Sequence, residues 1–133
     1  MNKILIIYAS KSGTTEKCAY KLANILKLVD VVNLSSSQNI NLDNYKTIII
    51  GGNIRMGLLS KKVKKFIREN KNKLLNKNTA YFICCGFIEN KEQYFQNNFP
   101  KDILERAIIY DAFGGEIALD KCNSFDRMIV KTI

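Results

Sequence analysis

Histidine and tryptophan are absent from this chain of 133 residues, and proline occurs only once, as Pro100. The chain has four cysteines, but they form no C-x-x-C pair and have no imidazole partner. Zinc ligation and Cys–His nucleophilic catalysis are therefore not expected. We expect Cys18, Cys84, Cys85 and Cys122 to be buried small side chains in a reducing compartment.

Long apolar runs are also missing. The longest, such as Ile4–Ile7, cover a few residues, whereas a membrane-spanning helix needs about 20. The N-terminal residues Met1–Lys3 lead into that run without the longer apolar region and cleavage site of a signal peptide. We therefore expect a cytoplasmic protein with at most peripheral membrane contact, and the length suits a single domain over residues 1–133.

Negative charge is scarce, since 12 acidic residues face 21 lysines and arginines, for a net charge of +9. This excess either attracts acidic ligands, anionic membrane or nucleic acid, or reflects a composition rich in Lys, Asn and Ile that solvates the surface. The cations are scattered apart from a group at Lys61, Lys62, Lys64 and Lys65. Nucleic-acid binding is not expected, because aromatic interleaving and a known motif are both lacking.

Short apolar runs rich in β-branched or aromatic residues indicate strands that are covered on both faces, as in a parallel sheet. They are Ile4–Ile7, Thr47–Ile50, Ala80–Cys85 and Ala107–Tyr110. A further segment, Val29–Leu34, carries polar residues and is expected to be an edge strand.

Helical spacing of apolar residues fills the gaps between these runs. It predicts helices over Thr15–Lys27, from Leu59 to Leu74, and on both sides of Pro100. Ser124 is expected to cap a last helix that runs to Ile133 and is short enough to leave the fifth strand partly bare. The alternation of strands and helices indicates a doubly wound α/β fold.

The segment Tyr8–Glu16 lies where the first strand gives way to a helix, and it is rich in hydroxyl groups. A helix start offers free N–H groups to an anion, and Gly13 allows the backbone to curl around it. The hydroxyls that could donate to phosphate oxygens belong to Ser10, Ser12, Thr14 and Thr15. A simple helix cap is the alternative, but a cap requires only one such residue.

The composition of this segment also separates classes of ligand. The P-loop pattern G-x-x-x-x-G-K-[ST] and the multiple glycines of a dinucleotide-binding loop are both absent, which favours a terminal monophosphate. The pattern Ser10-x-Ser12-Gly13-x-Thr15 resembles the FMN phosphate loop of flavodoxins. That resemblance implies a flavodoxin-like three-layer sandwich with a five-stranded parallel sheet in the order 2-1-3-4-5.

Further resemblance is to the flavodoxin-type protoporphyrinogen oxidases, in which an I-R-x-G element follows a glycine-rich turn. The similar segments are Tyr45–Gly57, Phe113–Glu116 and Phe125–Lys131. The resemblance implies an FMN-dependent oxidoreductase of heme biosynthesis that oxidises a porphyrinogen and passes electrons to a quinone or a redox partner protein. The alternative is a non-catalytic flavodoxin that carries electrons between protein partners.

The resemblance also assigns the cofactor-binding residues, with no catalytic side chain and no metal ligand among them. The phosphate is assigned to Ser10, Lys11, Ser12, Gly13, Thr14 and Thr15, and the flavin ring to Gly52, Asn53, Ile54, Arg55, Met56, Gly57, Cys85, Gly86 and Phe87. Unusual backbone angles are expected at Gly52, Asn53, Gly57 and Gly86. Without tryptophan, an aromatic ring stacked on the flavin would have to come from a residue such as Phe87 or Tyr110.

Several of these residues have a plainer interpretation. Gly51 and Gly52 could make a tight turn, Phe87 could belong to the core, and Arg55 could be a solvated loop charge. The aromatic residues between positions 89 and 106 either pack a helix onto the sheet or form a reduced membrane-meeting insertion like that of the longer oxidases. These aromatic residues are Tyr94, Phe95 and Phe99.

Overall fold

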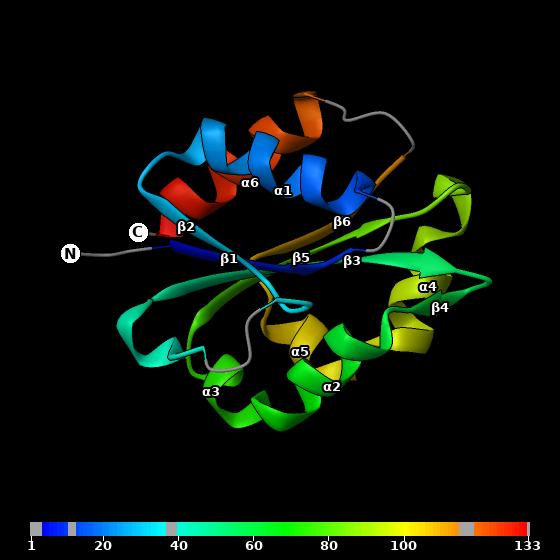
Figure 1. The fold of residues 1–133 in the computed structure, drawn as a ribbon, viewed down its shortest axis with the longest axis horizontal. Coiled ribbons are helices and arrows are strands. Elements are labelled where there is room, and N and C mark those ends of the chain that lie inside the picture. Colours follow the sequence, from blue (N-terminus) through cyan, green and yellow to red (C-terminus); the bar gives the residue numbers. More distant parts are fainter. Residues whose placement is uncertain (1–3, 11–12, 37–39, 115–118, 133) are drawn as a thin grey trace.

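The computed structural model describes residues 4–10, 13–36, 40–114 and 119–132. Its strands and helices alternate along most of the chain (Figure 1). In chain order they are β1 (Ile4–Ala9), α1 (Thr14–Leu26), β2 (Val29–Asn33), the 3-10 helix η1 (Leu42–Asn44), β3 (Thr47–Arg55), β4 (Leu58–Leu59), α2 (Lys61–Glu69), α3 (Lys71–Leu75), β5 (Asn78–Cys84), the 3-10 helix η2 (Ile88–Asn90), α4 (Lys91–Asn98), α5 (Lys101–Arg106), β6 (Ile109–Phe113) and α6 (Leu119–Thr132).

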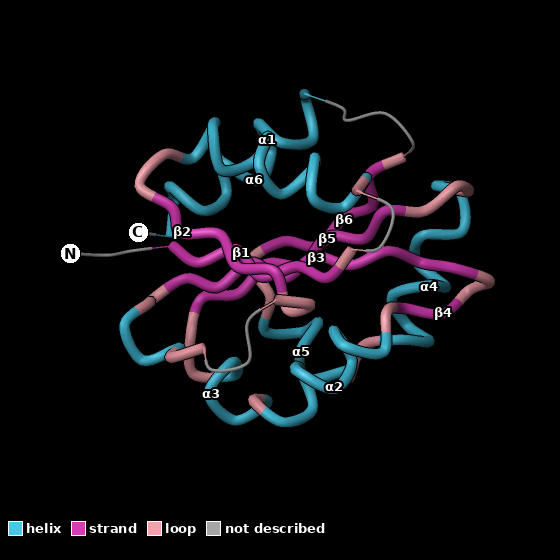
Figure 2. Tube along the Cα trace, viewed as in Figure 1, coloured by secondary structure: helices cyan, strands magenta, loops and turns pink. Residues whose placement is uncertain are grey.

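The long strands form one sheet in the order β2-β1-β3-β5-β6, and every pair along this path is parallel. This arrangement confirms the predicted order 2-1-3-4-5, counted without the short strand β4. Strand β4 pairs antiparallel with the end of β3 and was not predicted. The sheet lies between two layers of helices (Figure 2), so the flavodoxin-like three-layer architecture is confirmed.

Each face of the sheet has its own apolar core, because successive side chains of a strand point to opposite faces. In β1, Leu5 and Ile7 face the layer of α2 to α5, while Ile4 and Ile6 face the layer of α1 and α6. The central strands are therefore apolar on both faces, which explains their continuous apolar runs. No helix in the described part of the chain is both long and apolar enough to cross a membrane.

The predicted extents of three elements were wrong: the last strand, the helix from Leu59 to Leu74 and the last helix. Helix α5 ends in a cap at Ala107, whose N–H donates to the Leu104 carbonyl at 3.3 Å, so the last strand begins later than predicted. The predicted helix from Leu59 to Leu74 is divided at Asn70, where both the backbone N–H and the carboxamide donate to the Phe66 carbonyl at 3.0 Å.

The final helix also differs from the prediction. Ser124 lies inside α6, where its hydroxyl accepts a hydrogen bond from Arg127 at 3.2 Å, so it is not the cap. The longer helix buries Phe125 against Phe113 of β6, with ring centroids 5.6 Å apart. The helix therefore covers the end of β6, while the first three residues of that strand remain half-buried, as expected for a partly bare strand.

Candidate functional site

The carboxyl ends of β1, β3 and β5 meet at one edge of the sheet, on the right of Figure 1. The register places Ala9 beside Gly52, and Gly52 beside Ile83. Segments that follow the three strands therefore leave the sheet next to one another. An edge of this kind, where consecutive connections turn to opposite faces, is the usual binding place in open α/β sheets.

The turn from β1 into α1 is built around Gly13. Its φ of 86° is left-handed, and its N–H donates to Ser10 Oγ at 2.9 Å. The first backbone bond of α1 runs from Lys17 N–H to the Gly13 carbonyl at 3.0 Å. The N–H groups before Lys17 consequently have no acceptor within the helix and form its positive end. Two predicted phosphate ligands of this turn, Lys11 and Ser12, lie outside the described residues.

Thr15 is the polar residue of the turn that the fold encloses. Its side chain is fully buried, and its Oγ1 makes no hydrogen bond to an oxygen or nitrogen atom of the described residues, with the Cys84 thiol as a weak partner. An enclosed hydroxyl without a partner costs about 1–3 kcal/mol. An anion held at the start of α1 would supply an acceptor for this hydroxyl. The neighbouring Thr14 is half-buried. The chemistry of this turn fits a phosphate group.

The first turn of α1 is tied to β1 by a second contact. The Tyr8 hydroxyl donates to Glu16 Oε2 at 2.9 Å. Burial and this carboxylate together raise the pKa of Tyr8 to about 12. Tyr8 therefore stays a neutral donor over the physiological range, and it holds the start of the helix in place.

The predicted loop after the third strand is a β-hairpin. Strand β3 continues through Arg55, and Met56 and Gly57 form a two-residue turn with φ of 54° and 79° before β4. Two positive φ values are those of a type I′ turn, which matches the twist of the flanking strands. The expectation of unusual angles is confirmed at Gly57 and was wrong for Asn53, which is an ordinary strand residue.

The glycines Gly51 and Gly52 are strand residues too, so the interpretation as a tight turn was wrong. A Cβ atom at Gly51 would lie 1.9 Å from Phe82 Cζ, and one at Gly52 would lie 3.0 Å from side-chain atoms of Leu59 and Val63. Close packing from β5 therefore requires glycine at Gly51, and packing from β4 and α2 leaves little room for a side chain at Gly52. The conformational freedom of glycine is not the reason for either residue.

Asn98 holds the hairpin to α4, and nothing in the sequence pointed to it. Its Oδ1 accepts from the Leu59 N–H at 3.0 Å, and its Nδ2 donates to the carbonyls of Gly57 at 3.0 Å and Tyr94 at 2.8 Å. The side chain is buried. All of these partners are backbone groups, so the contact depends on tertiary placement that no local pattern reveals.

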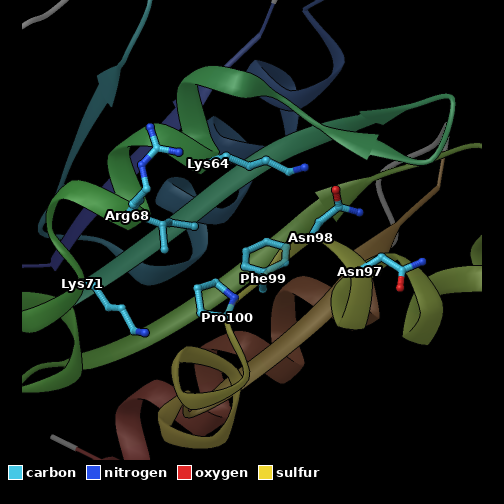
Figure 3. A pocket seen from close by; sticks show the side chains of 8 residues that line it. Lys64, Arg68, Lys71, Asn97, Asn98, Phe99 and Pro100 are labelled. Atoms are coloured by element: carbon cyan, nitrogen blue, oxygen red, sulfur yellow. The ribbon is translucent and has the colours of Figure 1, made fainter.

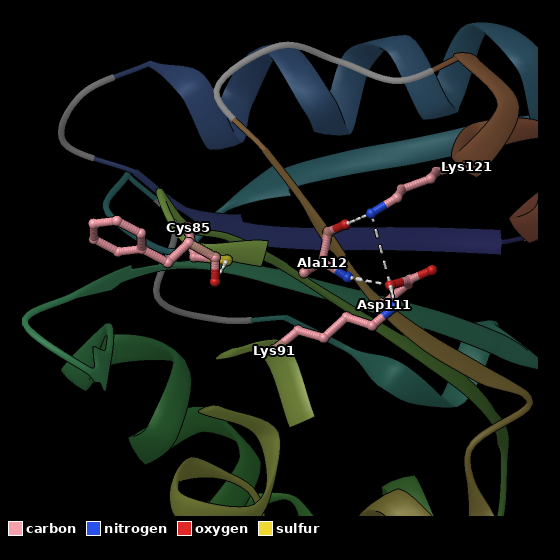
Figure 4. Close-up of polar contacts among 6 residues, drawn as sticks. Cys85, Lys91, Asp111, Ala112 and Lys121 are labelled. Atoms are coloured by element: carbon pink, nitrogen blue, oxygen red, sulfur yellow. Dashed lines mark hydrogen bonds and ion pairs between the residues drawn. The ribbon is translucent and has the colours of Figure 1, made fainter. Parts of the chain in front are cut away.

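The segment after β5 forms the other side of the site (Figure 4). Cys85 is buried, its Sγ donates to the Phe87 carbonyl at 3.8 Å, and burial raises the pKa of its thiol. Gly86 and Phe87 are exposed, and 62% of the Phe87 surface is accessible, so the interpretation of Phe87 as a core residue was wrong. Tyr110, the other aromatic candidate, packs against Phe95 with ring centroids 4.6 Å apart and belongs to the core.

A polar cluster lies behind this segment, at the end of β6. Asp111 accepts from Lys91 Nζ at 2.9 Å, and Lys121 Nζ lies 3.9 Å from the same carboxylate. Lys121 also donates to the carbonyl of Ala112. The Asp111 carboxylate raises the pKa of Lys91 and keeps it charged. These contacts join α4 and α6 to the last strand.

The fold and this edge define an open parallel α/β protein in which the start of the first helix has the chemistry that suits a phosphate group. The chain belongs to the flavodoxin domain family, which matches residues 5–133. The comparison with curated proteins found no match.

Solved structures give the same fold. Flavodoxin 2 from Bacillus cereus is 24% identical, with 98% of this chain and 99% of that chain covered and a TM-score of 0.69. Oxidised flavodoxin 1 from Bacillus cereus is 19% identical, with 99% of both chains covered and a TM-score of 0.72. A flavoprotein in complex with FMN from Lactobacillus acidophilus NCFM is 19% identical, with 86% and 91% covered and a TM-score of 0.63.

Proposed function

We propose that this chain binds FMN at the turn between β1 and α1 and exchanges electrons with a redox partner protein. FMN is the cofactor that the flavodoxin family indicates. The observation that carries the proposal is the buried Thr15 hydroxyl at the start of α1, which has only the weak Cys84 thiol as a partner among the described residues. A phosphate bound at this place would satisfy it.

Within this proposal, residues 10–15 hold the phosphate and the segments Gly52–Gly57 and Cys85–Phe87 hold the ring. Bound FMN supplies the one- and two-electron redox chemistry. Phe87 is the better candidate for the aromatic contact, because its side chain is exposed at this edge. Arg55 is exposed at the end of β3, where its cation would favour a negatively charged reduced cofactor by Coulomb attraction.

The test is a comparison of FMN with riboflavin, which lacks the phosphate. The purified protein should be yellow, and fluorescence titration of the apoprotein should show much tighter binding of FMN. Gly13→Val should abolish this preference, since valine is strained at a φ of 86°. Gly86→Ala is the contrast at the proposed ring site: its Cβ would meet no protein atom within 4 Å, and any effect on binding should fall equally on FMN and riboflavin. Equal affinity for both flavins in the unmodified protein would overturn the phosphate assignment.

A second candidate function is oxidation of a porphyrinogen, as the protoporphyrinogen oxidase resemblance implies. The net charge of +9 supports it, because cationic side chains suit the propionates of such a substrate. The proposed membrane-meeting role of the aromatic residues after position 89 loses support, since Phe95 and Phe99 are core residues. Anaerobic incubation of the FMN-loaded protein with protoporphyrinogen IX and a quinone tests this candidate, and absence of porphyrin fluorescence above the blank would exclude it.

A further inference from the structure

The most strongly charged element of the described surface is α2. The helix carries five cations and a single acid, Glu69, which is near its end. The cations are Lys61, Lys62, Lys64, Lys65 and Arg68. The first turn has no acidic residue, and Ser60 makes no side-chain cap bond. Cations at a helix start oppose the helix dipole, so this charge does not stabilise α2.

Several lysines on other elements are paired with acids. Lys71 pairs with Asp102 at 2.9 Å, and Lys91 pairs with Asp111 at 2.9 Å. By contrast, within residues 4–10, 13–36, 40–114 and 119–132 none of the five α2 cations has an ion-pair partner. The positive potential of α2 is therefore available to a partner outside the chain.

The shape beside α2 adds a second observation. A groove of about 340 Å³ runs along the helix, with Lys64, Arg68 and Lys71 on one wall and Phe99 and Pro100 among the residues of the other (Figure 3). Basic side chains thus border a hollow that is wide enough for acidic side chains of another protein.

Apolar side chains lie at the other end of the same surface. The β3–β4 hairpin leads directly into α2, and it exposes 95% of Met56 and 60% of Leu58. Exposed apolar residues bordered by charges are typical of protein interfaces, where methionine and arginine are enriched. Single-stranded nucleic acid would instead require aromatic side chains for stacking, and Phe66, the aromatic residue of α2, packs against the core.

We propose that α2, its groove and the tip of the β3–β4 hairpin form the docking surface for an acidic redox partner protein. This proposal rests on the proposed function and adds the charge of the partner. Cations on α2 would steer the acidic protein towards the hairpin, which borders the proposed FMN site. Met56 and Leu58 would supply the apolar contact once the proteins have met.

The test uses two acceptors that share a fold and a haem but differ in charge. They are cytochrome c, which is basic, and the same cytochrome with its lysines succinylated, which is acidic. After photoreduction of the FMN-loaded protein, each ferric haem takes one electron and becomes ferrous. At low salt the succinylated form should be reduced at least about tenfold faster, and the difference should disappear as salt screens the charges.

Two charge-matched variants locate the effect. Lys65→Glu/Arg68→Glu should remove or reverse the preference for the acidic acceptor. Lys21→Glu/Lys46→Glu carries the same net charge but changes exposed residues of α1 and of the segment before β3, so it should keep most of the preference. Equal rates for the two acceptors, or equal losses in both variants, would overturn the proposal.

A binding measurement separates this proposal from the proposed function. NMR titration of the apoprotein with oxidised succinylated cytochrome c should perturb amides of α2 and the hairpin even if no FMN binds. A protein that binds no FMN but shows this perturbation would refute the function and keep the docking surface. Competition by a short DNA duplex, lost in Lys65→Glu/Arg68→Glu, would instead assign the surface to nucleic acid and overturn the proposal.

Discussion

Removal of the Thr15 hydroxyl should have opposite effects on the stability of the apoprotein and on FMN binding. In the apoprotein it is buried with only the weak Cys84 thiol as a partner among the described residues, so its removal relieves a desolvation cost. Thr15→Val, which keeps the shape of the side chain, should raise the free energy of unfolding of the apoprotein by about 1 kcal/mol. The same variant should weaken FMN binding about tenfold or more, because a hydrogen bond to a charged group is lost.

Urea unfolding of the apoprotein and FMN titration measure these two effects separately. Thr79→Val is the matched control, because Thr79 is also buried but lies in β5, away from the turn. It should leave FMN affinity unchanged. A Thr15→Val protein that binds FMN as tightly as the unmodified chain would show that this hydroxyl does not contact the phosphate.

At the scale of single residues, the sequence predicted positions where the residue type itself is informative. Gly13 was recognisable as a turn residue, and its φ of 86° confirms that, while the assignment of the hydroxyls around it to a phosphate stays a prediction. The conformation of Met56 and the contacts of Asn98 were not recognisable. Met56 adopts a left-handed conformation that the hairpin imposes, and Asn98 acts on backbone groups about 40 residues away.

At the scale of elements, the close packing between β3 and β5 leaves no room for a side chain at Gly51. Its partner in the register is Phe82, whose ring occupies the space of a Cβ atom. Gly51→Ala should lower the free energy of unfolding by about 1–3 kcal/mol through overpacking, as measured by urea unfolding. Adding Phe82→Leu should recover part of the loss, and Gly86→Ala should change little because its surroundings are open. A stable Gly51→Ala protein would mean that the two strands can shift apart at low cost.

Elements with a strong apolar pattern were predicted well. The runs Ile4–Ile7 and Thr47–Ile50 are the cores of β1 and β3, and Thr15–Lys27 corresponds to α1. The ends of elements were harder, because tertiary contacts decide them. Strand β3 extends past its apolar run since its end pairs with β4, and two residues of β4 are too few to produce a pattern.

Over the whole molecule the strand order followed from the family resemblance, whereas the distribution of charge needed the structure. A net charge of +9 permitted either a solvated surface or an attraction for acidic partners. Ion pairs balance several lysines on other elements, whereas α2 gathers five cations with no ion-pair partner among the described residues. The position of a charge relative to its neighbours is not contained in composition.

Stability at high pH tests the interior of the whole molecule. Tyr81 lies in the core, its hydroxyl is buried with the Thr79 side chain as its weak partner, and burial raises its pKa to about 12. An unfolded tyrosine titrates near pH 10. The folded state therefore binds the Tyr81 proton more tightly, and this contribution to stability is complete below pH 10 and is lost as the pH rises through 12.

The free energy of unfolding that is lost through Tyr81 should reach about 3 kcal/mol, because its pKa differs by about two units between the folded and unfolded states. Lysines also titrate in this range, so the informative quantity is the difference between the unmodified protein and Tyr81→Phe, measured by urea unfolding at each pH. At pH 7 the variant should be more stable by about 1 kcal/mol, because no hydroxyl is buried with only a weak partner. Between pH 10 and 12 its advantage should grow, and parallel curves for the two proteins would contradict the raised pKa of Tyr81.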